Sequence, residues 1–175
     1  KGIVLLGGGR PVVIAAVALP EEPSPALRAV RDSKLMTPKS RERLFGVIRS
    51  QALSVSVAWA HPPVIDAGNI LRATLLAMGR ASRRAAAKAG GKPFLVLVDG
   101  PHRIPSFELS QEAVIDGDDK SLSIAAAGII AKVVRDRWMA RQDRRFPGYG
   151  FAQHKGYGTK SHLAVLGQLG PCAAH

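Results

Sequence analysis

The feature of this sequence that most constrains its fold is the uninterrupted apolar run Phe94–Val98, which ends in Asp99-Gly100. A run without polar alternation is typical of a strand that is covered on both faces of a sheet. Such strands belong to α/β folds, in which ligands collect at the carboxyl ends of the strands. Asp99 is therefore predicted to lie at a functional edge of a buried sheet.

Strand-type and helix-type segments alternate along the rest of the 175-residue chain, which suits one α/β domain over residues 1–175. The β-rich runs and the turn residues between them predict strands at Ile3–Leu6, Val12–Leu19, Leu53–Ala60 and Ala113–Ile115. Caps and helical spacing predict helices at Lys39–Ser50 after Thr37-Pro38, at Ile65–Ala87, from Ser121 or Ser123 to about Arg141, and at Ser161–Leu169.

The chain is strongly basic. Lys and Arg total 25 against 13 Asp and Glu, which gives a formal net charge of +12. No acid follows Asp143, so residues 144–175 form a basic C-terminal segment that contains Arg144, Arg145, Lys155 and Lys160. An excess of this size predicts a polyanionic partner, with nucleic acid as the first candidate. The alternative is a soluble surface that is merely rich in arginine.

Cysteine content and hydropathy indicate the compartment. Cys172 is the single cysteine, so an internal disulfide and a thiolate metal cluster are excluded, and we expect a cytoplasmic protein. The apolar run Pro11–Leu19 lacks a clear cleavage site and is interpreted as a strand rather than a signal peptide. No apolar run approaches the length of a membrane span, and we expect no membrane association.

Two carboxylates, Asp99 and Asp118, each follow a predicted strand in this basic chain. Mg²⁺ prefers oxygen ligands and commonly takes one or two protein carboxylates together with substrate phosphate. A pair of such cations can activate water and stabilise the leaving oxygen of a phosphodiester. An Asp at a strand end is also a common turn or cap residue, and the residues alone leave that alternative open.

Other acids fit a metal site less well. Asp136 lies 13 residues beyond Ser123 in the same predicted helix, about 20 Å along its axis, and is expected to pair with Arg135, Arg137 or a loop. Asp116 and Asp119 flank Asp118 in a strand-to-turn segment and are expected to point away from it.

Six segments carry a resemblance to a known family, and the resemblance extends from about Pro11 to Cys172. They are Arg31-Asp32-Ser33-Lys34, Asp66-Ala67-Gly68-Asn69-Ile70, Leu97-Val98-Asp99-Gly100, Gly117-Asp118-Asp119-Lys120-Ser121-Leu122-Ser123-Ile124-Ala125-Ala126-Ala127, Ala131-Lys132-Val133-Val134-Arg135-Asp136-Arg137, and Pro147-Gly148-Tyr149-Gly150-Phe151 with His154-Lys155-Gly156-Tyr157-Gly158-Thr159. In this order and spacing they resemble type 2 ribonuclease H, also called ribonuclease HII.

The resemblance implies a ribonuclease H-like α/β fold, with a five-stranded mixed sheet flanked by helices and a helical C-terminal segment. It implies a monomeric endonuclease of DNA replication and repair that hydrolyses the RNA strand of RNA–DNA hybrids and nicks DNA 5′ of embedded ribonucleotides. The implied cofactor is Mg²⁺ or Mn²⁺, held by four acids. Two of the four correspond to Asp99 and Asp118, which are thereby the predicted catalytic and metal-binding residues.

The first two acids of the family pattern are replaced here. Where the family has an adjacent Asp-Glu pair on its first strand, this chain has Val4 and Leu5, and Gly8 stands at the position of a substrate-contacting arginine. Arg10 is a candidate to replace that guanidinium. We therefore expect weakened cleavage, and the alternative is a member that binds duplexes without cutting them. A basic structural protein of the ribosomal type would explain the charge but not the motifs.

The predicted substrate contacts lie mainly outside the acids. Tyr157 matches a family tyrosine that stacks on the sugar after the ribonucleotide; the alternative is a half-buried surface aromatic. Phosphate contacts are predicted for the pair Ser33-Lys34 and also for Lys120, His154 and Lys155. The alternative for the last three is that a lone basic residue is usually only solvated.

Overall fold

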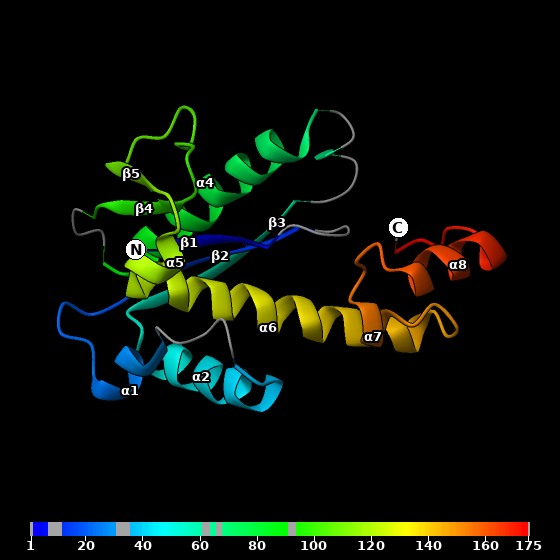
Figure 1. The fold of residues 1–175 in the computed structure, drawn as a ribbon. Coiled ribbons are helices and arrows are strands. Elements are labelled where there is room, and N and C mark those ends of the chain that lie inside the picture. The colour runs from blue at the N-terminus through cyan, green and yellow to red at the C-terminus, as the bar shows by residue number, and fades with distance from the viewer. Residues whose placement is uncertain are drawn as a thin grey trace.

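The computed structural model of this chain describes residues 2–6, 12–30, 36–60, 64–65, 68–90 and 94–174, with the backbone alone for residues 2–6. Its centre is a five-stranded sheet in the order β3-β2-β1-β4-β5. The strands are β1 (Gly2–Leu6), β2 (Val12–Ala18), β3 (Ser54–Ala60), β4 (Val96–Asp99) and β5 (Gln111–Val114). Strands β1, β2 and β3 pair antiparallel, whereas β4 is parallel to β1 and β5 (Figure 1). The predicted mixed sheet is confirmed.

The helices are capped as their sequences suggest. They are α1 (Pro25–Arg28), α2 (Pro38–Gln51), α4 (Ile70–Lys88), α5 (Gly117–Lys120), α6 (Leu122–Arg145), α7 (Phe151–His154) and α8 (Lys160–Leu169). Thr37 caps α2 by accepting a hydrogen bond from the Ser40 N–H at 3.2 Å, as predicted. Ser121, not Ser123, caps α6, because its hydroxyl accepts from the Ile124 N–H.

Several boundaries differ from the predicted ones. Helix α4 begins at Ile70 rather than Ile65, because Asn69 has extended backbone and caps the helix through the Arg72 N–H at 2.8 Å. Helix α6 continues to Arg145, where the following Phe146-Pro147 disfavours helical backbone. Strand β4 begins at Val96, two residues later than predicted, and the preceding Leu95 is half exposed.

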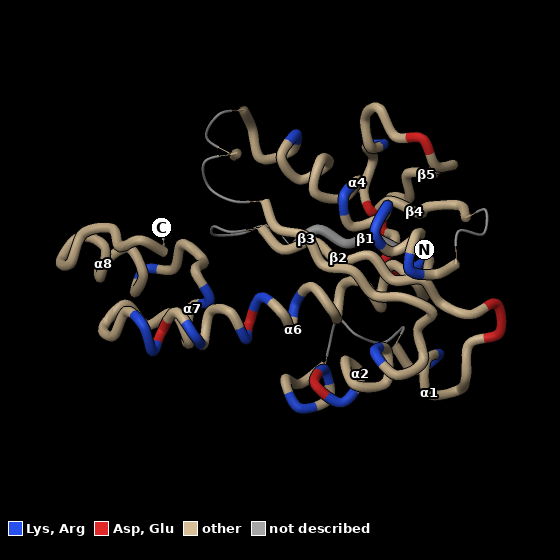
Figure 2. The backbone as a smooth tube through the Cα atoms, turned by 180° about the vertical axis from the view of Figure 1, so that it is seen from behind, with Lys and Arg blue, Asp and Glu red and all other residues tan. Residues whose placement is uncertain are grey.

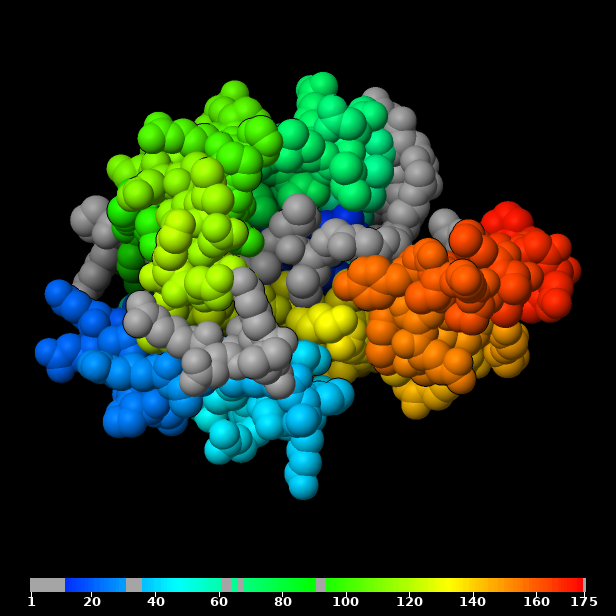
Figure 3. All heavy atoms as spheres, in the orientation of Figure 1, coloured from blue at the N-terminus to red at the C-terminus, as the bar shows by residue number. Residues whose placement is uncertain are grey.

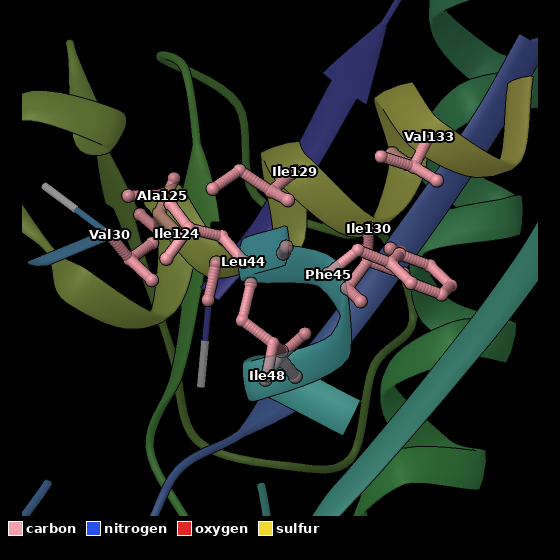
Figure 4. Close-up of a cluster of buried hydrophobic side chains, with 14 of the residues drawn as sticks. Val30, Leu44, Phe45, Ile48, Ile124, Ala125, Ile129, Ile130 and Val133 are labelled. Carbon is pink, nitrogen blue, oxygen red and sulfur yellow. The ribbon is translucent and has the colours of Figure 1, made fainter. Parts of the chain in front are cut away.

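Two hydrophobic layers hold the sheet. All seven residues of β2 are buried, and alternate ones face opposite sides. On one side Val13, Ala15 and Val17 pack against α2 and α6; Figure 4 shows Leu44, Phe45 and Ile48 of α2 directed at the labelled residues of α6. On the other side α4 lies close to the sheet through small side chains one helical turn apart: Ala73, Ala77, Ala81 and Ala85.

The two ends of α6 belong to different parts of the molecule. Its N-terminal end follows α5 beside β4 and β5, and its C-terminal end leads to α7 and α8 (Figure 1). The last two helices form a lobe that stands out from the body of the molecule, in orange and red in Figure 3. Among the described helices, none combines the length and the apolar character needed to cross a bilayer.

Candidate functional site

Asp99 ends the central parallel strand β4. Gly100 follows with left-handed backbone (φ +96°) and donates its N–H to the Val114 carbonyl at 2.9 Å, so the ends of β4 and β5 are tied together. The register pairs Asp99 with Val114. The predicted position of Asp99 at the carboxyl edge of the sheet is confirmed, and its side chain is half-buried there.

Asp118 lies near Asp99 but not at a strand end. After β5 the chain turns at Asp116, whose backbone is left-handed (φ 54°), and enters α5, where Asp118 is in the first turn. The expectation of a strand-end Asp118 is therefore corrected: the turn at Asp116 carries it into a short helix. Asp116 and Asp119 are exposed, whereas Asp118 is half-buried.

Gly117 joins the two acids. Its N–H donates to Asp99 Oδ1 at 3.0 Å, so the residue before Asp118 is bonded directly to the Asp99 carboxylate. A Cβ at this position would lie 2.9 Å from that oxygen and 2.5 Å from Ile124 Cδ1. Only glycine allows this approach, and the structure thus brings the Asp99 carboxylate and the start of α5 together.

Strand β1 supplies the other side of this edge. It runs parallel to β4, with Gly2 paired to Leu97 and Ile3 to Val98. Continuing the register by one residue places Val4 beside Asp99. Val4 and Leu5 are the positions at which the resemblance expects an Asp-Glu pair, so this edge has an apolar sequence where the family has carboxylates.

The loop between β4 and β5 is fastened to its surroundings. Arg83 of α4 donates three hydrogen bonds to Glu108, from Nε to Oε1 at 2.7 Å and to Oε2 at 3.0 Å, and from Nη2 to Oε2 at 2.8 Å. The bond from Arg83 lowers the pKa of the Glu108 carboxyl, and the same bond raises the pKa of Arg83. Gln111 bridges both backbone groups of Ile104, at 2.7 and 2.8 Å. These contacts hold the segment that follows Asp99.

Tyr157 lies beside the middle of α6. Its residue surface is 36% exposed, and two cations of α6 lie over its ring: the Arg135 guanidinium carbon at 4.8 Å and the Lys132 ammonium at 5.7 Å. An aromatic ring that is supported from below and open to solvent can stack on a sugar or base. The role of Tyr157 stays a prediction that this geometry permits.

The other predicted contacts fare differently. The Lys120 ammonium folds back to the Ile115 carbonyl at 2.7 Å, and Lys155 is half-buried with left-handed backbone. His154 is buried; its Nε2 donates to the Tyr149 carbonyl at 2.7 Å, and its Nδ1 accepts from the Gly156 N–H at 3.0 Å. Because both ring nitrogens are used inside the chain, the predicted phosphate contact of His154 is not supported. Arg10, Ser33 and Lys34 lie outside the described residues.

Asp136 has partners other than those expected. It pairs with Lys132 one turn earlier, at 3.0 Å, and with Arg41 of α2, at 4.0 Å. Arg137 instead pairs with Glu42 at 2.6 Å. The expected pairing of Asp136 with Arg135 or Arg137 is wrong, because successive residues of a helix point to different sides.

The surface charge continues along α6. Figure 2 shows Lys and Arg recurring from its middle to its end. Lys132, Arg137, Arg141, Arg144 and Arg145 are at least partly exposed, whereas Arg135 is buried. Among the described residues, no group of three or more His, Cys, Asp and Glu side chains is arranged to hold a metal ion.

Two residues near Tyr157 were not singled out from the sequence. Arg135 was noted only within a motif and as an expected partner of Asp136, and His162 of α8 had no signal at all, yet both contact the Tyr157 segment. A buried arginine or histidine in a helix is recognised only when the segment packed against it is known.

Known proteins match this chain over most of its length. The sequence profile of the family described as Ribonuclease HII matches residues 5–175. Ribonuclease HII of Geobacter metallireducens is 49% identical over 165 residues, which cover 94% of this chain and 74% of that protein. Ribonuclease HII of Syntrophotalea carbinolica is 50% identical, covering 94% of this chain and 76% of that protein.

Solved structures match as well. The PCNA:RNase HII complex from Archaeoglobus fulgidus contains a chain with a TM-score of 0.80 and 28% identity, covering 99% of this chain and 89% of that chain. Bst-RNase HIII, solved in complex with Mn²⁺, shares the fold at a TM-score of 0.78 and 19% identity, covering 97% of this chain and 62% of that chain.

Proposed function

This chain belongs to the ribonuclease HII family, whose members are endoribonucleases, and from that premise we propose that it acts on RNA–DNA hybrids and on DNA with embedded ribonucleotides. The observation that supports the proposal is the hydrogen bond from the Gly117 N–H to Asp99 Oδ1, which joins Asp99 to the residue before Asp118. The reaction is hydrolysis of the RNA strand of hybrids and a nick 5′ of the ribonucleotide in DNA.

In the part of the chain that the structure describes, the residues fit one divalent cation and do not fit two. Asp99 and Asp118 would hold a single Mg²⁺ or Mn²⁺ together with substrate phosphate, since such ions commonly take one or two protein carboxylates. A cation bound there supplies positive charge to the phosphate oxygens. The side chains of Val4 and Leu5 offer no oxygen for a second cation, so we propose that this chain cleaves its substrate only slowly.

The substrate would be held along α6. Tyr157 stacks on a sugar next to the cleaved position, and Lys120 and Lys155 contact phosphates. Ser33, Lys34 and Arg10 belong to the proposed contact set on the resemblance alone. We assign no phosphate contact to His154, because its ring is bonded inside the chain.

A second candidate function is binding without cleavage. The specific observation in its favour is the apolar pair Val4-Leu5 at the register position next to Asp99. Such a protein would grip the hybrid through its basic surface and Tyr157 and release it unchanged.

A cleavage assay separates the two candidates. The substrate is a DNA duplex with one embedded ribonucleotide, incubated with Mg²⁺, with Mn²⁺ or with EDTA. We expect slow cleavage by the unaltered chain, abolished by EDTA and by Asp99→Asn. The double change Val4→Asp with Leu5→Glu should raise the rate at least about 100-fold, because metal-held charge is worth several kcal/mol and each 1.4 kcal/mol is tenfold.

The matched control is Val4→Asn with Leu5→Gln, which has similar size without the charges and should stay slow. Fast cleavage by the unaltered chain, insensitive to Asp99→Asn, would contradict the proposal. Salt-sensitive duplex binding with no product under either metal would favour the second candidate. We also propose that the chain works as a monomer in the cytoplasm. Sedimentation of the purified protein tests its oligomeric state.

A further inference from the structure

Three buried side chains from three helices hold the backbone around Tyr157. Arg135 of α6 donates its Nη2 to the Lys155 carbonyl at 3.0 Å, His154 of α7 accepts from the Gly156 N–H at 3.0 Å, and Nδ1 of His162 of α8 lies 2.9 Å from the Tyr157 carbonyl. The three residues are 1%, 8% and 6% exposed. Three successive residues of one turn are thus each bonded to a different buried side chain.

The turn is also pressed tightly against α6. Lys155 and Gly156 both have left-handed backbone, with φ of 52° and 75°. A Cβ at Gly156 would lie 2.3 Å from Met139 Cε, so a side chain here would have to displace the end of Met139 as well as adopt a strained backbone. A left-handed lysine costs about 1 kcal/mol, and such a conformation persists where the surroundings determine it.

The two histidines form one packed unit. Their rings are stacked, with centroids 4.0 Å apart and planes 12° from parallel, and Phe151 meets both edge-on. Because the Tyr157 carbonyl can only accept, Nδ1 of His162 carries a proton and donates it. His154 has the opposite tautomer, with its proton on Nε2 toward the Tyr149 carbonyl.

We infer that His162 and Arg135 are positioning residues, which fix Tyr157 in the orientation that stacks on the bound strand. This inference rests on the proposed function. Arg135 bonds the turn and lies against the Tyr157 ring, with its guanidinium carbon 4.8 Å from the ring centroid, while His162 bonds the Tyr157 carbonyl. Fixing the ring before binding removes the cost of ordering it in the complex. Helix α8 thereby contributes to substrate binding through Tyr157.

The experiment measures the affinity for a labelled RNA–DNA hybrid in EDTA, where cleavage does not occur. Tyr157→Ala should weaken binding about tenfold, the size of one stacking contact. His162→Phe keeps the ring stack but loses the donor, and it should weaken binding about fivefold, since one hydrogen bond contributes near 1 kcal/mol. His162→Asn places an amide N–H near the position of Nδ1 and should restore most of the affinity.

A double-mutant cycle separates positioning from a general structural role. If His162 acts through Tyr157, His162→Phe has no further effect in the Tyr157→Ala background. A second comparison is between Arg135→Met and the control Arg137→Met. Both remove one positive charge from α6, but Arg137 is exposed and pairs with Glu42. The change at Arg135 should be the more damaging, and it too should lose its effect when Tyr157 is absent.

Amide hydrogen exchange gives a readout that does not depend on binding. His162→Phe should speed exchange at Gly156 and Tyr157, while the α4 amides stay unchanged. Equal loss of affinity with and without the Tyr157 ring, or unchanged exchange at the turn, would overturn the inference and leave the proposed function intact. If the unaltered chain did not bind the hybrid, while His162→Phe accelerated exchange at the turn as expected, the proposed function would be overturned instead.

Discussion

At the scale of single residues, the candidate site depends on the absence of a side chain at Gly117. Its N–H bonds the Asp99 carboxylate at 3.0 Å, and the space where a Cβ would stand is occupied by Asp99 Oδ1 and by Ile124 of α6. The absence of one side chain therefore sets the distance between the strand that carries Asp99 and the helix that carries Asp118.

We predict that Gly117→Ala displaces this contact. The new methyl group would meet Ile124 Cδ1 at 2.5 Å, and overpacking of this kind costs about 1–3 kcal/mol in the free energy of unfolding. Urea denaturation measures the loss, and any metal-dependent cleavage should fall with it. The control is Gly46→Ala at an exposed position of α2, where nothing lies within 4 Å of the added Cβ and the change should stabilise by up to about 1 kcal/mol. Equal stabilities for the two variants would contradict the packing at Gly117.

At the scale of elements, α2 and α6 are held to the sheet by one apolar layer. Ile48 of α2 has no exposed surface and packs among α6 residues in the cluster drawn in Figure 4. Leu53, five residues later, is 53% exposed at the rim of an open groove between α2, β3 and α6. Two aliphatic side chains of similar size, five residues apart, are thus one fully buried and one half exposed.

Ile48→Ala should lower the free energy of unfolding by about 2–5 kcal/mol, because it removes buried methyl groups and leaves a cavity. Leu53→Ala is the matched change of an exposed aliphatic residue and should cost well under about 1 kcal/mol. Thermal unfolding of both variants checks the difference. A large loss from Leu53→Ala would mean that the groove is closed in solution.

At the scale of the whole molecule, the net charge of +12 governs association with nucleic acid. Each neutralised phosphate releases counterions, so affinity falls with salt in proportion to the number of ionic contacts. We predict that affinity for an RNA–DNA hybrid falls at least tenfold between 50 and 200 mM salt, since several Lys and Arg contacts give a slope of that size.

The slope of affinity against salt also distinguishes the contacts. Tyr157→Ala should weaken binding without altering the slope, because stacking on a ring releases no ions. The double change Arg144→Ala with Arg145→Ala should reduce the slope by up to about 2 if both side chains reach phosphates. Titrations at four salt concentrations measure all three proteins. A flat salt dependence would remove the electrostatic basis for the proposed binding.

Much of the fold followed from local patterns. The caps at Thr37 and Ser121, the β-rich runs and the apolar run before Asp99 are each encoded within a few neighbouring residues, and all were recovered in the structure. The errors lie at boundaries and in the short helices α1, α5 and α7, which were not predicted. The start of α4 depended on whether Asn69 caps the helix or continues it, which its side-chain bond to Arg72 decides.

The sequence by itself determined the family, the alternation of strands and helices, and the replacement of two acids by Val4 and Leu5, because each of these is written in contiguous residues. Only the tertiary structure decided that Gly117 touches Asp99 and that His154 is enclosed. It alone also brought Arg135 and His162 into hydrogen bonds with the same turn. The partners in these contacts come from different elements and pack together only after the chain has folded, so local patterns do not encode them.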